Sequence, residues 1–360
     1  MHTPENIARV NAVGLMSGTS MDGVDLAACS FELRDNTWSY TLHHATTVPY
    51  PAAWLEKIRS LPGLHAAEVF EADAALGRYF GGLVLDFVKT HGFRADLVAS
   101  HGHTLFHKPS RGYTTQIGSG AHLAAVCGVR TICDFRSKDV ALGGQGAPLV
   151  PVGDHLLFPE YEACLNLGGI ANISLLSAGK RIAFDICPVN MALNMLAERE
   201  NLRYDDQGKM ARQGKLLPGL LEQLNGLSFY QQQGPKSLGR EWYEQEFAPL
   251  LGQGSAADLS RTVCEHIAEQ HLRVFGQLKP QSKILVTGGG AFHTFLLERM
   301  AEKSQKVLTV PAEDLVKFKE ALVFAFLGVL NYSGRVNVFD SATGSVKQHV
   351  GGAMYWGDVL

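Results

Sequence analysis

The chain has 360 residues, of which 35 are acidic and 32 basic, giving a formal net charge of −3. This near-balance provides no broad positive field, which argues against general nucleic-acid binding. An apolar share of 46% with 19% charged residues is typical of a folded globular protein. The length favours about two domains.

Membrane and export signals are not expected. Residues 1–13 lack the uninterrupted apolar stretch of a signal peptide, and the longest apolar run, 321–330, is about half of a membrane span. We interpret that run as a buried helix. The six cysteines are scattered without a CxxC pair, which favours reduced thiols in a cytoplasmic protein over a disulfide framework or a zinc site.

The first half of the chain alternates between strand and helix patterns. Apolar runs predict strands over residues 10–16, 24–33, 38–48, 95–100 and 130–134, of which the first three form a meander. Apolar residues at helical spacing predict helices over residues 51–59, 66–89 and 121–127. Residues 135–148 are rich in glycine and show no period, which predicts a loop.

The second half repeats this alternation. Strands are predicted over residues 162–167, 173–176, 182–185, 283–287 and 307–310, and helices over residues 190–200, 258–275 and 292–303. Residues 10–32 and 162–185 share one plan, an apolar strand, a glycine-rich turn and a second apolar strand. The sequence therefore predicts an α/β protein with a duplicated strand–turn–strand core.

The two glycine-rich turns are candidates for phosphate binding. Gly18, Thr19 and Ser20 in one turn, and Gly168 and Gly169 in the other, expose backbone N–H groups of the kind that bind phosphate oxygens. Asp22 and Asp25 carry oxygens suited to Mg²⁺. The alternative is a pair of tight turns without a ligand. No Walker loop and no GxGxxG fingerprint occurs.

A third glycine cluster and an aspartate extend this hypothesis. Gly288, Gly289 and Gly290 join a predicted strand to a helix, where a nucleotide can approach the backbone or where small residues simply pack. Asp185 ends a predicted strand, where it could be a general base or cap the helix that begins near residue 190. Cys187 lies two residues after Asp185, but the sequence shows no base or cation beside it that would lower the pKa of its thiol and make it a nucleophile.

Four further residues are candidates for functional roles. His101 and His103 could bind a metal, although satisfied loop histidines near a ligand are the favoured interpretation. Arg136 could bind the carboxylate or phosphate of a ligand, or it could form a surface salt bridge. Glu320 opens an apolar helix, where the helix dipole favours a carboxylate.

Eight motifs together resemble the 1,6-anhydro-N-acetylmuramic acid kinases, and they occur in order along nearly the whole chain. They are GLMSGTSMDGVD, SHGHTLFHKP, TTQIGSGAHLA, DFRSKDVALGGQGAPLVP, NLGGIANIS, PKSLGRE, VTGGGAFH and KEALVFAFLG. The resemblance implies the actin-like ATPase and sugar kinase fold, with an interdomain cleft. It also implies an N-terminal domain of residues 1–135 plus roughly 335–360 and a C-terminal domain of residues 136–334.

The resemblance implies a reaction and a set of residues. ATP would phosphorylate 1,6-anhydro-N-acetylmuramic acid from cell-wall turnover while water opens the anhydro ring, giving N-acetylmuramic acid 6-phosphate. Asp185 matches the catalytic aspartate, and Arg136 and Glu320 the sugar-binding positions. The family's ATP-phosphate segment matches Gly18, Thr19, Ser20, Met21, Asp22, Gly23, Val24 and Asp25. With the glycine-rich turns described above, the expected ATP-binding residues also include Gly168, Gly169, Gly288, Gly289 and Gly290, and Asp22 is the residue expected to hold Mg²⁺.

One segment departs from the family pattern. The family commonly has FDTGPGN where this chain has FDICPVN, so that Ile186, Cys187 and Val189 replace a small hydroxyl residue and two glycines, and Asn194 stands where an aspartate is common. Two alternatives therefore stay open. One is a kinase of another anhydro- or amino-sugar, and the other an actin-like ATPase or regulator without an acceptor. The expected partners are ATP, the sugar and a second copy of the chain in a homodimer.

Overall fold

The computed structural model describes residues 7–18, 21–232 and 236–357, which form two compact units. Unit 1 comprises residues 1–158 and 318–360, and unit 2 residues 159–317. The sequence prediction assigned residues 136–158 and 318–334 to the second domain instead. The structure groups them with unit 1 because the apolar part of helix α12 (Glu313–Tyr332) packs there, with Phe326 against Phe31 and Trp38 at ring distances of 5.3 and 5.0 Å.

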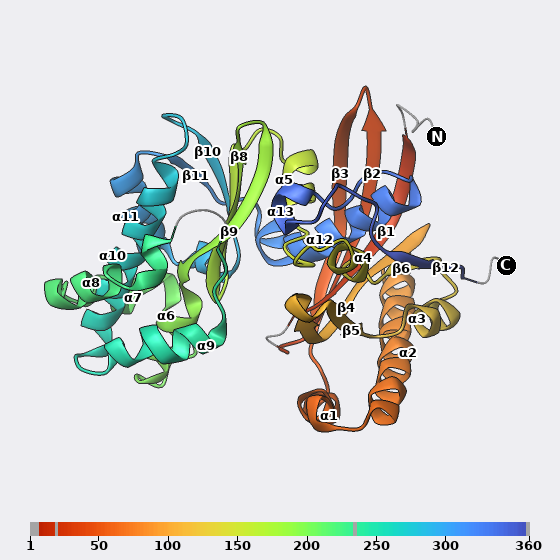
Figure 1. Ribbon diagram of the computed structural model, residues 1–360, viewed down its shortest axis with the longest axis horizontal. Helices are drawn as coiled ribbons and strands as arrows, with labels where there is room; N and C mark the ends of the chain where they lie inside the picture. The colour runs from red at the N-terminus through yellow and green to blue at the C-terminus, as the bar shows by residue number, and fades with distance from the viewer. Residues whose placement is uncertain (1–6, 19–20, 233–235, 358–360) are drawn as a thin grey trace. The chain divides into compact units, whose positions relative to one another are not determined.

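Unit 1 is built on a seven-stranded sheet (Figure 1). The strands run in the order β12-β6-β4-β1-β2-β3, with β5 paired to β4. Their bounds are β1 Ile7–Ser17, β2 Val24–Arg34, β3 Thr37–Val48, β4 Leu97–Lys108, β5 Tyr113–Ile117, β6 Thr131–Cys133 and β12 Ala353–Tyr355. The helices of this unit, besides α12, are α1 Ala52–Ser60, α2 Ala66–Thr90, α3 Gly120–Cys127, α4 Ser137–Ala141, α5 Pro151–Leu157 and α13 Asp340–Thr343.

Alternating residues of β1 face two different helical layers. Val13 and Leu15 belong to a core that includes Phe80 and Val84 of α2. On the opposite face, Gly14 lies where a side chain would collide with the backbone oxygen of Ala321 in α12. Glycine at this position therefore lets the apolar helix lie directly on the sheet.

Unit 2 repeats the topology of unit 1 with a five-stranded sheet in the order β11-β10-β7-β8-β9. Its strands are β7 Ala163–Leu167, β8 Ile170–Ser177, β9 Lys180–Pro188, β10 Lys283–Thr287 and β11 Val307–Thr309. In both units three antiparallel strands come first, and the fourth strand then pairs in parallel with the first. The predicted α/β class with a duplicated strand–turn–strand core is confirmed.

The helices of unit 2 supply most of its core. Their bounds are α6 Asn190–Glu198, α7 Lys209–Gln213, α8 Pro218–Asn225, α9 Arg240–Trp242, α10 Ala256–Phe275 and α11 Thr294–Ser304. Helix α10 is the central one, with Leu259, Val263 and Ile267 fully buried in the main hydrophobic cluster. None of the described helices combines the length and apolar character that crossing a membrane requires.

Candidate functional site

The first glycine-rich turn connects β1 to β2 in unit 1. Thr19 and Ser20 lie outside the described residues. On either side of them, the amide of Met21 donates to the backbone oxygen of Gly18 at 3.2 Å, and Met21 has a left-handed φ of 57°. A side chain at Gly23 would lie 2.8 Å from the backbone oxygen of Val48. Gly23 therefore packs directly against the end of β3.

Two carboxylates follow this turn. Asp25 accepts a hydrogen bond from Oγ1 of Thr47 at 2.6 Å, while Asp22 is exposed. Burial raises the pKa of Asp25, the Thr47 bond lowers it, and the charge of Asp22 raises it again. This mutual repulsion would be relieved by a cation, which fits Mg²⁺ with phosphate and water as its other ligands. Within the described residues, no group of three or more His, Cys, Asp and Glu side chains could hold a metal by itself.

The two histidines of the SHGHT motif lie on β4 rather than in a loop, and each binds a different neighbour. His103 Nδ1 lies 2.9 Å from Oγ of Ser17, the last residue of β1, and Ser17 also contacts the Tyr50 hydroxyl at 2.7 Å. His101 Nε2 accepts hydrogen bonds from Nε and Nη2 of Arg136 at 3.0 and 2.8 Å. The histidines therefore support the end of β1 and the Arg136 side chain.

The Arg136 guanidinium is not bonded directly to a carboxylate of the described residues. Its Nη1 donates to the backbone oxygen of Gly146 at 2.5 Å, so its hydrogen-bond acceptors are a neutral imidazole and a carbonyl. Among the described side chains it makes no ion pair, so the surface salt bridge of the alternative interpretation is not found. Burial lowers its pKa to about 10, and Glu320 and Asp139 raise it, so the guanidinium is charged at neutral pH. Such a group suits an anionic ligand.

Glu320 lies further inside its helix than predicted. Helix α12 begins at Glu313, so Glu320 is about two turns from the N-terminus and not in the first turn. Its side chain reaches solvent, but the surrounding protein displaces enough water to raise its pKa. Lys319 and Arg136 lower that pKa, whereas Asp25 and Asp154 raise it. The charge of Glu320 therefore interacts with the charges of Arg136 and Asp25.

The second glycine-rich turn, between β7 and β8 in unit 2, has open amide groups. In the described part of unit 2, neither the N–H of Gly168 nor that of Gly169 donates a hydrogen bond. The nearest atoms that a side chain on either glycine would meet lie 3.3 Å away. Asn190 fixes the turn, because its amide donates to Gly168 O at 3.1 Å and its Nδ2 to Leu167 O at 2.9 Å. The turn fits a phosphate group.

The third glycine cluster packs beside the same turn. A side chain at Gly288, whose φ is +82°, would lie 2.8 Å from the backbone carbon of Leu167, and one at Gly290 would lie 2.8 Å from Leu167 Cβ. Gly289 is less confined, with Asn190 Nδ2 nearest at 3.3 Å. The structure thus brings the two glycine segments of unit 2 together around Asn190. Gly288 and Gly290 allow this close packing, and Gly289 is the least confined of the three.

Asp185 is half-buried in β9, which continues beyond it to Pro188 instead of ending at the predicted residue. Its Oδ2 accepts hydrogen bonds from the amide of Leu238 at 2.8 Å and from Oγ of Ser237 at 3.1 Å. Asp185 does not cap α6, because Val189 is the N-cap residue and no side-chain bond is made there. Burial raises the pKa of Asp185, and the two hydrogen bonds lower it in part.

A cavity of about 460 Å³ adjoins β9 in unit 2. Its walls include Asp185, Tyr230, Lys236, Gln270 and Arg273. Lys236 is already bound to the backbone oxygens of Phe229 and Gln232 at 2.9 and 3.4 Å. The volume is sufficient for a small polar ligand. Sequence patterns did not reveal Tyr230, Gln270 and Arg273, because they lie on helices that carry no recognisable motif.

The residues that depart from the family pattern lie in the core. Ile186, Cys187 and Val189 are at most 3% exposed and belong to the hydrophobic cluster of unit 2. Burial raises the pKa of Cys187 although the charge of Lys236 lowers it, so this thiol is no activated nucleophile. The departure therefore fills the interior behind Asp185 with apolar side chains.

Two comparisons of the sequence with known proteins agree on one family. The family model described as anhydro-N-acetylmuramic acid kinase matches residues 10–357. The chain is 34% identical to the anhydro-N-acetylmuramic acid kinase of Vibrio cholerae serotype O1, over 96% of this chain and 98% of that protein. It is 32% identical to that of Caldanaerobacter subterraneus subsp. tengcongensis, over 92% and 93%. Xylulose kinase from Lactobacillus acidophilus is a distant structural likeness, with 10% identity, 89% coverage of both chains and a TM-score of 0.43.

The sequence matches first define the class of the protein, which is a kinase, an enzyme of the phosphotransferase type. More particularly, the chain belongs to the anhydro-N-acetylmuramic acid kinase family. The predicted family is thereby confirmed, and kinase membership implies that ATP and a sugar are its substrates.

Proposed function

We propose that this enzyme phosphorylates 1,6-anhydro-N-acetylmuramic acid with ATP during peptidoglycan recycling and gives N-acetylmuramic acid 6-phosphate. The family match over residues 10–357 carries this proposal. In the proposed reaction, the oxygen of water bonds to C1 of the sugar as the C1–O6 bond breaks. O6 then bonds to the γ-phosphorus, and the bond from that phosphorus to ADP breaks.

Asp185 is the proposed general base that takes a proton from the attacking water. Its raised pKa supports this role, because a base works best when its pKa lies near the working pH. Oδ2 is held by Leu238 and Ser237, so the carboxylate is oriented before substrate arrives. The cavity beside Asp185 offers space for a sugar on the same unit.

The remaining roles concern charge and phosphate. The segment from Gly18 to Asp25 and the turns containing Gly168 and Gly289 are proposed to hold the ATP phosphates. Mg²⁺, held by Asp22, would neutralise phosphate charge when bound. Arg136 is proposed to bind the lactyl carboxylate of the sugar, supported by its charge and neutral acceptors. Glu320 is proposed to help hold the water.

We also propose that the protein is a homodimer in the cytoplasm.

A coupled assay of ADP release tests the proposed function. It should show release that depends on the anhydro-sugar and a product whose mass equals N-acetylmuramic acid 6-phosphate. ADP release of the same size without sugar, together with ligand-induced assembly, would instead indicate an ATPase or regulator.

A kinase of a different anhydro- or amino-sugar is the second candidate. It is favoured by Ile186, Cys187 and Val189, which replace small residues directly after Asp185. A panel of anhydro- and amino-sugars in the same assay separates the two candidates by kcat/KM. A preference of at least about tenfold for another sugar would support the second one.

A further inference from the structure

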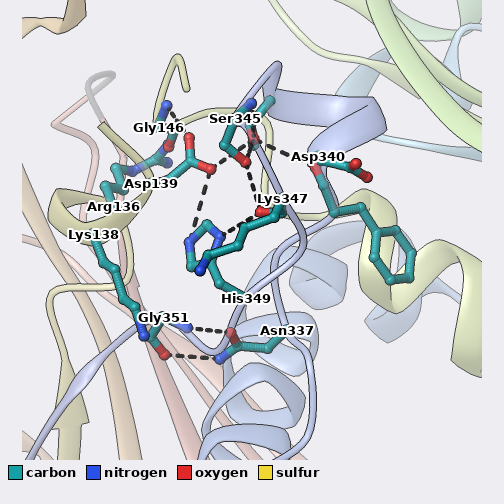
Figure 2. A network of polar contacts seen from close by, with 12 residues as sticks. Arg136, Lys138, Asp139, Gly146, Asn337, Asp340, Ser345, Lys347, His349 and Gly351 are labelled. Atoms are coloured by element: carbon teal, nitrogen blue, oxygen red, sulfur yellow. Dashed lines mark hydrogen bonds and ion pairs between the residues drawn. The ribbon is translucent and has the colours of Figure 1, made fainter. Parts of the chain in front are cut away.

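Asp139 is a fully buried carboxylate that lies one helical turn after Arg136 (Figure 2). Its Oδ2 accepts the amide N–H of Gly146 at 2.7 Å, and its Oδ1 accepts the hydroxyl of Thr343 at 2.7 Å. His349 Nε2 lies 3.8 Å from the same Oδ1. A buried carboxylate is kept in place by such donors, because it has no water to bind.

The loop that follows α4 is shaped around this carboxylate. The amide of Gly144 donates to the backbone oxygen of Asp139 at 2.9 Å, and a side chain at Gly144 would collide with the Asp139 carboxylate. Gly146 has a left-handed φ of +70°. The carboxylate and the two glycines thus define where the Gly146 peptide lies.

Gly146 is the link between Asp139 and Arg136. Its N–H is bound by Asp139, and its carbonyl oxygen accepts Nη1 of Arg136 at 2.5 Å. On its other side, Arg136 is bound by His101. The guanidinium therefore has two supports, and one of them depends on the Asp139 carboxylate.

The C-terminal segment, residues 337–351, completes this arrangement. The backbone oxygen of Thr343 accepts the amide of Gln145 at 2.8 Å, and Nζ of Lys138 donates to the backbone oxygen of Val350 at 2.8 Å. Asn337 holds the segment by exchanging bonds with the Gly351 backbone at 2.7 and 3.0 Å (Figure 2). A segment about 200 residues away in sequence thus supports the loop that carries Gly146.

We propose that Asp139, fixed by Thr343 of the C-terminal segment, is a positioning residue that holds Arg136 through Gly146 for binding the acidic group of the substrate. This inference rests on the proposed function for the identity of that group. No contact between Asp139 and the substrate is needed. The expected signature is therefore a loss of sugar affinity that vanishes when Arg136 is already absent.

The test is a double-mutant cycle of Asp139→Ala and Arg136→Ala, with steady-state kinetics for both substrates. Arg136→Ala should raise the sugar KM about 10- to 100-fold, the effect of losing a charged hydrogen-bond partner. Asp139→Ala should raise it about tenfold with little change in kcat or in the ATP KM. In the Arg136→Ala background, Asp139→Ala should add less than about twofold.

Two further variants exclude a general loss of folding. Asp73→Ala is the matched control, because Asp73 also accepts a backbone N–H in unit 1, from Gly118 at 2.7 Å, without contacting Arg136. It should leave the sugar KM unchanged. Asp139→Asn keeps an oxygen for Gly146 and should restore most of the affinity. Effects that add in the cycle, or a lower kcat at constant sugar KM, would overturn the inference.

A measurement without sugar separates this inference from the proposed function. In ¹⁵N–¹H spectra of the free protein, the Nε–H signal of Arg136, assigned by its loss in Arg136→Ala, should be visible in wild type and in Asp73→Ala. It should broaden or disappear in Asp139→Ala. An unchanged signal would contradict the positioning role. If wild type fails to turn over the sugar while the signal responds as expected, only the proposed function fails.

Discussion

The carboxylate of Asp185 accepts the amide N–H of Leu238 through Oδ2 at 2.8 Å. The same oxygen accepts the Ser237 hydroxyl, whereas Oδ1 has no hydrogen-bond donor within the described residues. A carboxylate anchored through one oxygen presents the other in a defined direction. This arrangement suits a base that must meet a water molecule.

Asp185→Asn should abolish most turnover while leaving ATP binding intact. The amide keeps the shape of the side chain but cannot take a proton, so kcat should fall by about 10²- to 10⁴-fold. The KM for ATP should stay within about threefold. Asp258→Asn is the control, because Asp258 also accepts a backbone N–H in unit 2, from Lys215 at 2.6 Å. Full activity of Asp185→Asn would remove Asp185 from the mechanism.

Ser237→Ala should shift the pH profile of kcat/KM. Activity requires ionised Asp185, so it falls as the pH drops through the pKa of this group, which burial holds above the ordinary value for aspartate. The Ser237 bond lowers that pKa. Its removal should raise the pKa and move the acid limb of the profile to higher pH. A limb that stays in place, or moves to lower pH, would show that it reports another group.

Local patterns predicted most of the strands. Residues 283–287 were predicted as a strand and form β10 with the same bounds, and the turn that exposes Gly168 was predicted from its glycines. These features depend on short stretches of sequence, in which apolar runs and glycines are visible directly. The reaction itself was predicted from the resemblance to a family, because the hydrophobic pattern of a sequence does not specify a reaction.

Contacts between distant segments were not predictable in this way. Residues 135–148 were predicted as a loop, but they contain α4, which is short and held by Thr343 from the C-terminal segment. Arg273 adjoins the cavity only because α10 packs near β9. Likewise, α12 continues from unit 2 into unit 1 without a composition shift, so the unit boundary within it had no signal in the sequence.

Two glycine variants should separate ligand binding from folding. Gly168→Ala meets no atom closer than 3.3 Å, so it should leave the thermal midpoint nearly unchanged but raise the KM for ATP, because the methyl group obstructs the open turn. Gly288→Ala forces a left-handed conformation and a clash with Leu167, and should destabilise the protein by about 1–3 kcal/mol. Calorimetry and ATP kinetics on both variants check this. A destabilised Gly168→Ala with normal ATP KM would contradict it.

Acid should destabilise the protein partly through His101. Burial first, and then the charge of Arg136, lower the pKa of His101 to about 3. The unfolded chain takes up this proton near pH 6.5, so stability falls as the pH drops from about 6.5 towards 3, by about 1.4 kcal/mol per unit. His101→Gln can still accept from Arg136 but does not titrate. Urea unfolding at several pH values should show a shallower decline for this variant, and parallel declines would refute the assignment.

The reaction in ¹⁸O-labelled water tests the central proposal most directly. We predict that mass spectrometry finds one ¹⁸O atom in the sugar phosphate, located at C1 by fragmentation, because water adds there as the C1–O6 bond breaks. Unlabelled product incubated for the same time in labelled water corrects for exchange at the reducing end. A sugar phosphate without label above this control, or label found only in inorganic phosphate beside intact anhydro-sugar, would contradict the proposed reaction.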